Sequence, residues 1–409
     1  MSLNSTPSGE RIHIGIFGRR NAGKSSLINA LASQKLAIVS NYKGTTTDPV
    51  YKTMELLPLG PVMIIDTPGI DDEGELGQLR ISKTYQVLNK TDIALLVVDS
   101  KAGLAAEDLQ LWQHMQNKKI PAILVFNKAE LLEEMEQALL TAAALKLTKQ
   151  CFFVSAVNNT QIHELKEAIG ALKPKDTENP LINDILNPGD VVVLVTPIDS
   201  AAPKGRLILP QQQVLRNIID KGAIAIVTRE TELKSTLERL SAPPQLVITD
   251  SQVFGKVNKM LPPEIPLTSF SILMARYKGN LYDAVKGVRQ LDNIDNGDKI
   301  LISEGCTHHR QCGDIGTVKL PAWIKNYTKS EPIFEFTSGT EFPADLSSYK
   351  MIIHCGACML NEREIQHRYQ CANTQNIPIT NYGIAIAYMN GILQRTVAPL
   401  PEIAQLLNS

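Results

Sequence analysis

A strand, a glycine-rich loop and a helix near the N-terminus constrain the fold most strongly. The β-branched run His13–Phe17 is followed by the loop Gly18–Ser25 (GRRNAGKS) and then by the helical segment Ser26–Leu31. This is the context of a P-loop, in which backbone N–H groups and the amino end of the helix surround phosphate oxygens. Lys24 can then reach the β- and γ-phosphates, and the Ser25 hydroxyl can ligate Mg²⁺. The sequence therefore predicts a nucleoside triphosphate site on an α/β sheet.

Charge and hydropathy exclude several classes of protein. The 409 residues carry 41 Lys and Arg against 42 Asp and Glu, a net charge of −1. The whole chain therefore gives no electrostatic reason to expect nucleic acid or an acidic membrane as a partner. The first residues lack the basic and apolar regions of a signal peptide, and apolar runs such as Ile93–Val98 are too short to span a bilayer. We expect a soluble, cytoplasmic protein.

The spacing of apolar runs and proline-rich stretches predicts about three α/β domains. Short β-branched runs alternate with amphipathic segments, which is typical of a mostly parallel sheet with helices on both faces. Polar, proline-rich stretches separate the domains. We expect a flexible N-terminus (1–10), a nucleotide-binding domain (11–172), a linker (173–190), a small α/β domain (191–262) and a cysteine-rich α/β domain (263–409).

Four further polar motifs follow the P-loop in order. Asp66 directly follows an expected strand, so it can hold a water bound to Mg²⁺ while the Gly69 N–H reaches the γ-phosphate. Thr45 or Thr46 can complete the Mg²⁺ shell and become ordered around the γ-phosphate. Because parallel strands end at one edge of a sheet, we expect all these motifs at one site. The motifs are Gly44–Asp48, Asp66–Gly69, Asn127–Glu130 and Ser155-Ala156.

The predicted nucleotide site takes residues from all five motifs. Four of them, Lys24, Thr46, Asp66 and Gly69, are expected to act on the reaction itself. The full predicted set is Gly18, Asn21, Ala22, Gly23, Lys24, Ser25, Ser26, Thr45, Thr46, Asp66, Gly69, Asn127, Lys128, Glu130, Ser155 and Ala156.

In this order the motifs resemble those of small GTP-binding proteins of the translation-factor-like class, close to Era and the tRNA-modification GTPases. The resemblance implies a GTP/GDP switch that hydrolyses GTP with Mg²⁺. It also matches Asn21 to an asparagine that helps to hold K⁺ beside the phosphates in potassium-activated members. The alternative for Asn21 is a residue that simply suits a tight turn.

Two positions depart from the pattern of that class. Glu130 stands where the guanine motif has aspartate, so its carboxylate lies one methylene further from the backbone. This difference leaves open how strongly the site prefers guanine over other bases. Ile70 stands where a water-orienting glutamine would follow, so intrinsic hydrolysis is expected to be slow unless another group positions the water. The candidates are acidic residues, which alternatively form a solvated loop that responds to the nucleotide. They are Asp71, Asp72, Glu73 and Glu75.

Five of the six cysteines lie beyond residue 300. If the expected strands 299–303 and 351–353 are parallel neighbours, Cys306, Cys355 and Cys358 meet at one sheet edge. Three thiolates there suit a zinc site or an iron–sulfur cluster, and an unreactive buried pair of cysteines is the third alternative. His308 and His354 are candidates for a fourth ligand, or for hydrogen bonding around the site.

Cys306-x-His308 followed by His354-Cys355-x-x-Cys358, behind a GTPase domain, resembles the [FeFe]-hydrogenase maturation GTPases, the HydF-type scaffold proteins. Other stretches share the likeness: Asp66–Gly77, Ala201–Leu207, Pro210–Gln213 and Ser269–Gly279. The resemblance implies a central dimerisation domain, and a C-terminal domain that binds a [4Fe–4S] cluster through the three cysteines. It also implies a homodimer that receives a diiron subcluster from two radical-SAM maturases and delivers it to apo-[FeFe]-hydrogenase.

Two functions from different classes remain after this step. The first is a cluster carrier in which GTP binding and hydrolysis gate partner interactions. The second is an Era-like GTPase associated with RNA or the ribosome, with a structural zinc domain. The second predicts a basic surface or an RNA-binding module, and neither the net charge nor the C-terminal sequence indicates one.

Overall fold

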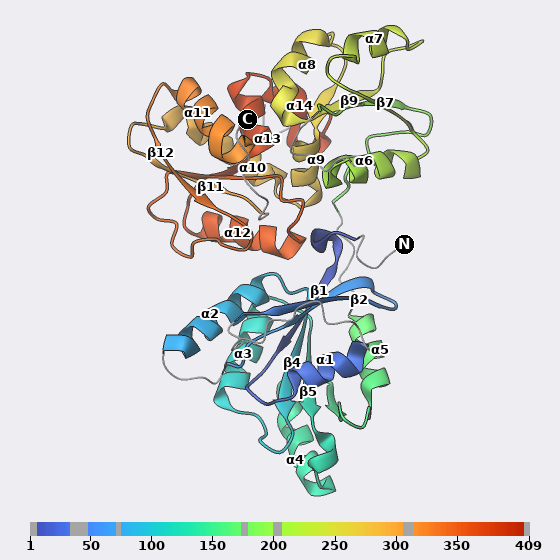
Figure 1. Ribbon diagram of the computed structural model, residues 1–409, viewed down its shortest axis with the longest axis vertical. Coiled ribbons are helices and arrows are strands. Elements are labelled where there is room, and N and C mark those ends of the chain that lie inside the picture. The colour runs from blue at the N-terminus through green and yellow to red at the C-terminus, as the bar shows by residue number, and fades with distance from the viewer. Residues whose placement is uncertain are drawn as a thin grey trace. The chain divides into compact units, whose positions relative to one another are not determined.

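The computed structural model describes residues 6–32, 48–70, 75–172, 179–198, 207–305 and 314–404. The chain divides into two compact units, Met1–Asp176 and Thr177–Ser409 (Figure 1). The described strands form three sheets with helices packed on them, so the expected α/β class is confirmed. No helix within these ranges is long and apolar enough to cross a membrane.

The first unit is built on a sheet of six described strands in the order β2-β3-β1-β4-β5-β6. Neighbouring strands are parallel except β2 and β3, which are antiparallel. The five strands expected from the sequence are present; β2 is an addition, because its mixed polar and apolar residues form no continuous apolar run. The strands are β1 (Ile12–Phe17), β2 (Val50–Leu56), β3 (Gly60–Asp66), β4 (Ile93–Asp99), β5 (Ala122–Asn127) and β6 (Cys151–Val154).

Two apolar cores lie on the opposite faces of this sheet, because successive side chains of a strand point to opposite sides. On β4, Leu95 and Val97 join one core, and Leu96 and Val98 join the other. Helices α1 and α5 contribute to the first core, and α2 and α3 to the second. The helices are α1 (Lys24–Ala32), α2 (Glu75–Asn89), α3 (Ala106–Asn117), α4 (Glu134–Ala144) and α5 (Ile162–Ala171), with short turns η2 (Ser8–Glu10) and η3 (Ala129–Leu131).

The second unit contains two four-stranded sheets, β10-β9-β7-β8 and β12-β11-β13-β14, in which all described neighbours are parallel. One continuous apolar core connects the two sheets. The strands are β7 (Val191–Val195), β8 (Ile224–Thr228), β9 (Leu246–Thr249), β10 (Leu267–Ser269), β11 (Lys299–Ser303), β12 (Ile333–Thr337), β13 (Met351–His354) and β14 (Ile379–Asn381).

In the second unit helices connect the successive strands, as is usual between parallel strands, except between β12 and β13, where the connection is a loop. They are α6 (Leu209–Asp220), α7 (Leu233–Glu238), α8 (Phe254–Met260), α9 (Phe270–Tyr277), α10 (Leu281–Gly287), α11 (Leu320–Thr328), α12 (Glu362–Thr374), α13 (Tyr382–Met389), α14 (Leu393–Val397) and α15 (Pro401–Ala404). Three short helical segments complete the unit: η4 (Ser251–Val253), η5 (Val288–Asn293) and η6 (Ile315–Lys319).

Two features of the second unit bear on the expected domains. β10 lies beyond the boundary expected at residue 262, yet it hydrogen bonds to β9, so the central sheet extends past that boundary. β13 lies between β11 and β14 and is parallel to both, as expected for the strands that precede the cysteine loops. The ends of β11 and β13 therefore meet at one edge of the last sheet.

Candidate functional site

The P-loop between β1 and α1 has the backbone that phosphate binding requires. Gly18 has φ +143°, and an added Cβ there would lie 2.1 Å from the Val97 carbonyl oxygen. Gly23 has φ +85°, and its Cβ would lie 2.2 Å from the Asn127 side-chain nitrogen. Only glycine fits either position, because of the dihedral angle and the close approach. Asn21 has φ +61°, in the left-handed region that asparagine tolerates, which suits its turn interpretation.

The residues predicted to contact phosphate and Mg²⁺ lie together. Lys24 is buried, and its ammonium donates hydrogen bonds to the carbonyls of Gly18 and Arg19, each at 2.8 Å. Ser25 Oγ donates to Asp66 Oδ2 at 2.6 Å, which joins the P-loop to the end of β3. Burial raises the pKa of Asp66, and the Ser25 hydrogen bond and the Lys24 charge oppose that shift. A hydroxyl and a carboxylate at this distance are oxygen donors of the kind that Mg²⁺ prefers.

Asn127 at the end of β5 connects three of the predicted motifs. Its side-chain nitrogen donates to the Ala22 carbonyl at 3.1 Å, and its side-chain oxygen accepts from the Ala156 N–H at 3.2 Å. The buried Ser100 hydroxyl donates to the Asn127 carbonyl at 2.6 Å. Ser155 lies beside Ala156 and accepts from the Asn158 N–H at 3.1 Å. The P-loop, the guanine motif and the last loop therefore meet in one place, as predicted.

The remainder of the guanine motif is more open. Lys128 has φ +65°, and its ammonium lies 2.6 Å from Asp99 Oδ2 at the end of β4. Burial raises the pKa of Asp99, but hydrogen bonds from Lys128 and from the Lys101 N–H outweigh it, so the pKa is lowered overall. Glu130 is exposed on η3. The contact with Asp99 was not identified from the sequence, although Asp99 stands opposite Asn127 in the β4–β5 register.

A second ion pair joins the P-loop to helix α3, and it was not predicted from the sequence. Arg19 Nε donates to Asp108 Oδ2 at 2.9 Å, and the Asp108 side chain is fully buried in the first turn of α3. No short motif signals this pair, because its partners come from distant segments.

Two predicted residues of the nucleotide site make none of the contacts described above. Ser26 is exposed in the first turn of α1, and Gly69 is partly buried after β3. The predicted residues that lie outside the described residues are Thr45, Thr46, Asp71, Asp72, Glu73, Cys306 and His308.

The loops after β11 and β13 contact each other at the cysteine site. Cys355 Sγ accepts hydrogen bonds from the Gly305 N–H at 3.0 Å and the Ala357 N–H at 3.4 Å. Burial raises the pKa of Cys355 to about 11, and these two donors oppose the shift. Burial also raises the pKa of Cys358. Gly305, which makes this contact, directly precedes Cys306 in the sequence.

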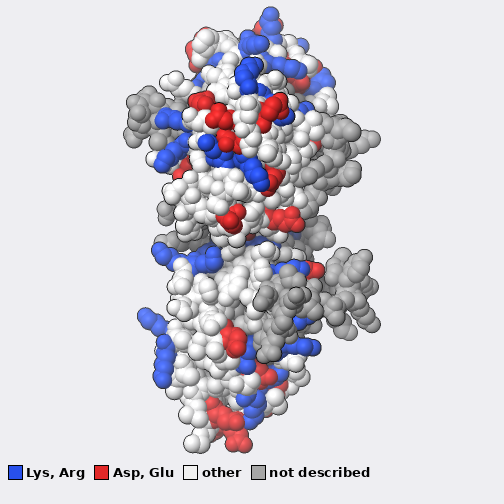
Figure 2. Space-filling model, turned by 90° about the vertical axis from the view of Figure 1, so that its left-hand side faces the viewer, with Lys and Arg blue, Asp and Glu red and all other residues white. Residues whose placement is uncertain are grey.

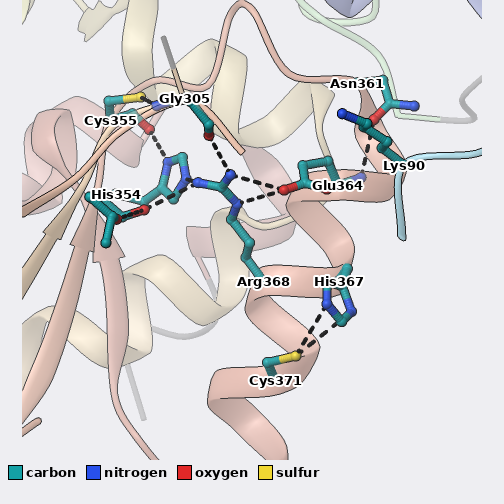
Figure 3. Close-up of polar contacts among 12 residues, drawn as sticks. Lys90, Gly305, His354, Cys355, Asn361, Glu364, His367, Arg368 and Cys371 are labelled. Atoms are coloured by element: carbon teal, nitrogen blue, oxygen red, sulfur yellow. Dashed lines mark hydrogen bonds and ion pairs between the residues drawn. The ribbon is translucent and has the colours of Figure 1, made fainter. Parts of the chain in front are cut away.

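His354 uses both ring nitrogens within the protein (Figure 3). Nδ1 lies 2.9 Å from the Cys355 carbonyl oxygen, and a carbonyl only accepts, so Nδ1 carries the proton. Nε2 therefore accepts from Arg368 Nη1 at 3.0 Å. Burial and the Arg368 charge lower the pKa of His354 to about 3. The sequence left two roles open for His354, a fourth cluster ligand or a hydrogen-bonding residue around the site. The contacts of both ring nitrogens correspond to the second role.

One buried side chain near Cys355, that of Tyr369, suits a cluster with sulfur acceptors. Tyr369 is 3% exposed, and its hydroxyl has no hydrogen-bond partner within the described part of the chain. Such an orphaned donor needs an acceptor, and cluster sulfides accept hydrogen bonds. Glu304 is a buried carboxylate beside this loop and accepts from the Tyr382 hydroxyl at 3.2 Å. Within the described ranges, no three His, Cys, Asp or Glu side chains form a metal-binding group.

Comparison with known families accounts for both units. The profile described as 50S ribosome-binding GTPase matches residues 13–128. The profile described as Hydrogen maturase F dimerization domain matches residues 181–279, and the one described as Hydrogen maturase F tetramerization domain matches residues 282–399. The last two together span more than half of the chain. The chain belongs to the hydrogen maturase F family. The descriptions of these two matching domains indicate an oligomer.

Individual relatives cover only part of the chain. The tRNA modification GTPase MnmE of Helicobacter pylori (strain Shi470) is 36% identical over 172 residues, 41% of this chain and 38% of MnmE. GTPase Era of Carboxydothermus hydrogenoformans is 31% identical over 166 residues, 40% of this chain and 55% of Era. The crystal structure of an Aquifex aeolicus Era variant bound to GDP·AlF4− is 20% identical and covers 53% of this chain and 91% of that one, with a TM-score of 0.36. The chain thus spans less than two thirds of both sequence relatives.

Proposed function

We propose that this chain hydrolyses GTP with Mg²⁺ in its first unit and carries a [4Fe–4S] cluster on Cys306, Cys355 and Cys358 in its second. One observation carries the cluster proposal: the Gly305 N–H bonds to Cys355 Sγ, which brings the loop that leads to Cys306 against the Cys355–Cys358 pair. An N–H···S bond of this kind is typical around cluster thiolates. The proposed site of action is the cytoplasm.

In the nucleotide site, the chain's own groups bind and orient the triphosphate. The P-loop N–H groups and the amino end of α1 bind the phosphates, and the Lys24 ammonium neutralises charge that develops on them. Ser25 and Thr46 would hold Mg²⁺, which supplies further neutralisation when bound, and Asp66 would hold one of its waters. The Gly69 N–H would bind the γ-phosphate, and Thr45 and Thr46 are proposed to respond to that phosphate in the GTP state.

Two finer features of the nucleotide site belong to the proposal. Asn21 would hold K⁺ beside the phosphates, and hydrolysis should then be faster in K⁺ than in Na⁺. Asn127, Lys128, Glu130, Ser155 and Ala156 would bind the guanine base. Contacts of Asn127 with both the P-loop and Ala156 support this assignment, because they bring base-binding and phosphate-binding segments together.

In the cysteine site, the three thiolates would hold a four-iron cluster and would leave one iron without a cysteine ligand. That position supplies an exchangeable coordination site when the cluster is bound. The diiron subcluster, made by two radical-SAM maturases, is the cargo that binds here and passes to apo-[FeFe]-hydrogenase. His354 orients the Cys355 carbonyl, and His308 remains the candidate for the fourth ligand.

Nucleotide state would gate these transfers by changing partner affinity. A ligand shifts an equilibrium only between states for which its affinity differs, so GTP and GDP must favour different loop arrangements. The Thr45–Asp48 loop and residues 71–75 are the proposed readers of that difference. The functional unit is proposed to be a homodimer or a higher oligomer, which the dimerization and tetramerization descriptions of the two matching families support.

The decisive experiment is metal analysis of protein made without oxygen, with its EPR spectrum. We expect about four irons and four sulfides per chain. The variants Cys306→Ser, Cys355→Ser and Cys358→Ser should lose them, and Cys151→Ser is the matched control. One tightly held zinc without iron would instead support a structural zinc domain.

The RNA-associated alternative has a simple test of its own. On the face that Figure 2 shows, Lys and Arg of the second unit lie among Asp and Glu, which is not the pattern of a basic RNA-binding patch. Salt-dependent binding to structured RNA would favour this alternative, and absence of binding at low salt would remove it.

A further inference from the structure

Arg368 is a fully buried cation in the middle of α12, and it connects the segments that carry the cysteine site (Figure 3). Its Nη1 lies 3.0 Å from His354 Nε2 and donates to Ser303 Oγ at 3.1 Å. Its Nη2 donates to the Gly339 carbonyl at 2.6 Å. Ser303 and His354 are the last residues of β11 and β13, the two strands whose following loops bring in the cysteines.

The guanidinium has one acidic partner among these contacts. Glu364, one turn earlier on α12 and 5% exposed, accepts from Arg368 Nε at 3.1 Å and from Nη2 at 2.9 Å. The carboxylate therefore lies along one edge of the guanidinium. Among the described residues, the other edge, at Nη1, meets the neutral acceptors Ser303 and His354. The positive charge thus faces the cysteine loop, with the His354 ring between it and the backbone of Cys355.

A charge buried in this way acts strongly on its surroundings. Charges interact more strongly in a protein interior than in water, because fewer mobile dipoles screen them. The potential of an iron–sulfur cluster depends on the net charge and hydrogen bonds around it. Each electron added to a cluster makes it one unit more negative, so a nearby cation favours the reduced state and a nearby carboxylate disfavours it.

We propose that Arg368 is a positioning residue that raises the reduction potential of the cluster, and that Glu364 sets the size of this effect by holding the guanidinium and partly neutralising it. The inference rests on the proposed [4Fe–4S] cluster and deepens that function. It assigns part of the control of the cluster's reduction potential to a side chain that is not a ligand, while the buried carboxylate of Glu304 beside the same loop acts in the opposite direction.

The test compares two substitutions that break the same ion pair but change the charge in opposite directions. The full-length chain, reconstituted with iron and sulfide without oxygen, is titrated with dithionite and followed by EPR. We expect Arg368→Gln to lower the midpoint potential and Glu364→Gln to raise it. Arg216→Gln removes an exposed charge on α6 and should leave the potential unchanged.

A purely structural role predicts something else. Loss of the ion pair would then move both potentials in the same direction, or move neither, and either result would overturn the inference. If Arg368→Gln does not retain iron, the potentials of Arg368→Lys and Glu364→Gln test the proposal instead. Arg368→Lys keeps the positive charge, so its midpoint potential should differ less from that of the wild type than the potential of Glu364→Gln does. An unchanged or lowered potential in Glu364→Gln would contradict the proposal.

The same experiment separates this inference from the function on which it rests. Iron and sulfide content of the wild-type chain tests the cluster itself. A wild-type chain without iron would remove both proposals. A wild-type chain with about four irons, whose potential does not respond to Arg368 and Glu364 as described, would remove only this one.

Discussion

In the nucleotide site, the functional side chains belong to short motifs at strand ends, and Asn127 joins these motifs through hydrogen bonds to Ala22 and Ala156. In the cysteine site, the motifs end at Cys355 and Cys358, and the residue that connects the surrounding segments is Arg368, from a helix without any motif. In the first site the motif residues themselves make the connecting hydrogen bonds, and the Arg19–Asp108 pair supports the P-loop from α3. The second depends on a buried ion pair, whose loss leaves a charge without a partner.

The largest effect is expected at the ion pair of the cysteine site. Arg368→Ala leaves Glu364 buried without its partner, which should cost about 3–5 kcal/mol in the free energy of unfolding of the second unit. The chain has two tryptophans, Trp112 in the first unit and Trp323 in the second. Urea unfolding of a Trp112→Phe background, followed by fluorescence, therefore reports on the second unit.

A double variant tests whether the buried charge causes this loss. Arg368→Met combined with Glu364→Leu removes both charges and should recover most of the lost stability. Arg216→Ala, at an exposed pair, should change it by less than about 1 kcal/mol. A double variant as unstable as Arg368→Ala would mean that shape rather than charge is responsible.

In the nucleotide site, Asn127→Ala should mainly weaken binding. It removes two hydrogen bonds that join the P-loop to the base-binding loops, at a cost of about 1–3 kcal/mol, so the Kd for GTP should rise roughly 5- to 150-fold. Titration with a fluorescent GTP analogue measures it. Asn117→Ala, exposed at the end of α3, is the matched control. An unchanged Kd would show that the motifs hold together without Asn127.

His354 predicts a pH dependence for the stability of the second unit. Its pKa is lowered to about 3 in the fold, whereas an unfolded imidazole has a pKa of about 6.5. Protons therefore bind the unfolded state preferentially, and the stabilisation present above pH 6.5 is lost as the pH falls from there toward 3. At pH 5 this amounts to about 2 kcal/mol.

Urea unfolding between pH 7 and pH 5, again read from Trp323, measures this loss. The His354→Gln variant should lack this part of the pH dependence. The same slope in the variant and the wild type would assign the effect to other groups.

The smallest effect is expected at Glu130, which is exposed and at the edge of the nucleotide site. Glu130→Asp moves the carboxylate to the distance usual in the guanine motif. The preference for GTP over inosine triphosphate should increase by no more than about tenfold, since one hydrogen bond to a charged group contributes about 1.5 kcal/mol. Competition between the two nucleotides measures it, and a weaker preference would mean that the backbone of η3 has adapted to glutamate.

Much of the first unit could be predicted because its signals are local. Gly18 and Gly23 are required by backbone dihedral angles, and Asp66 and Asn127 directly follow apolar runs that can only be buried strands. β2 escaped prediction, since an edge strand with mixed residues has no strong pattern of its own. The pairs Arg19–Asp108 and Lys128–Asp99 escaped because each joins segments that are distant in sequence.

By itself, the sequence determined the P-loop, the order of the nucleotide motifs and the cysteine pattern, because each depends on residue type at short spacing. The tertiary structure alone decided that His354 donates to the Cys355 carbonyl and accepts from Arg368. It also decided that a cation faces the cysteine loop. Hydrogen-bond partners and buried charges depend on which strands and helices meet, and no local pattern encodes a contact between β13 and a helix that follows it in the chain.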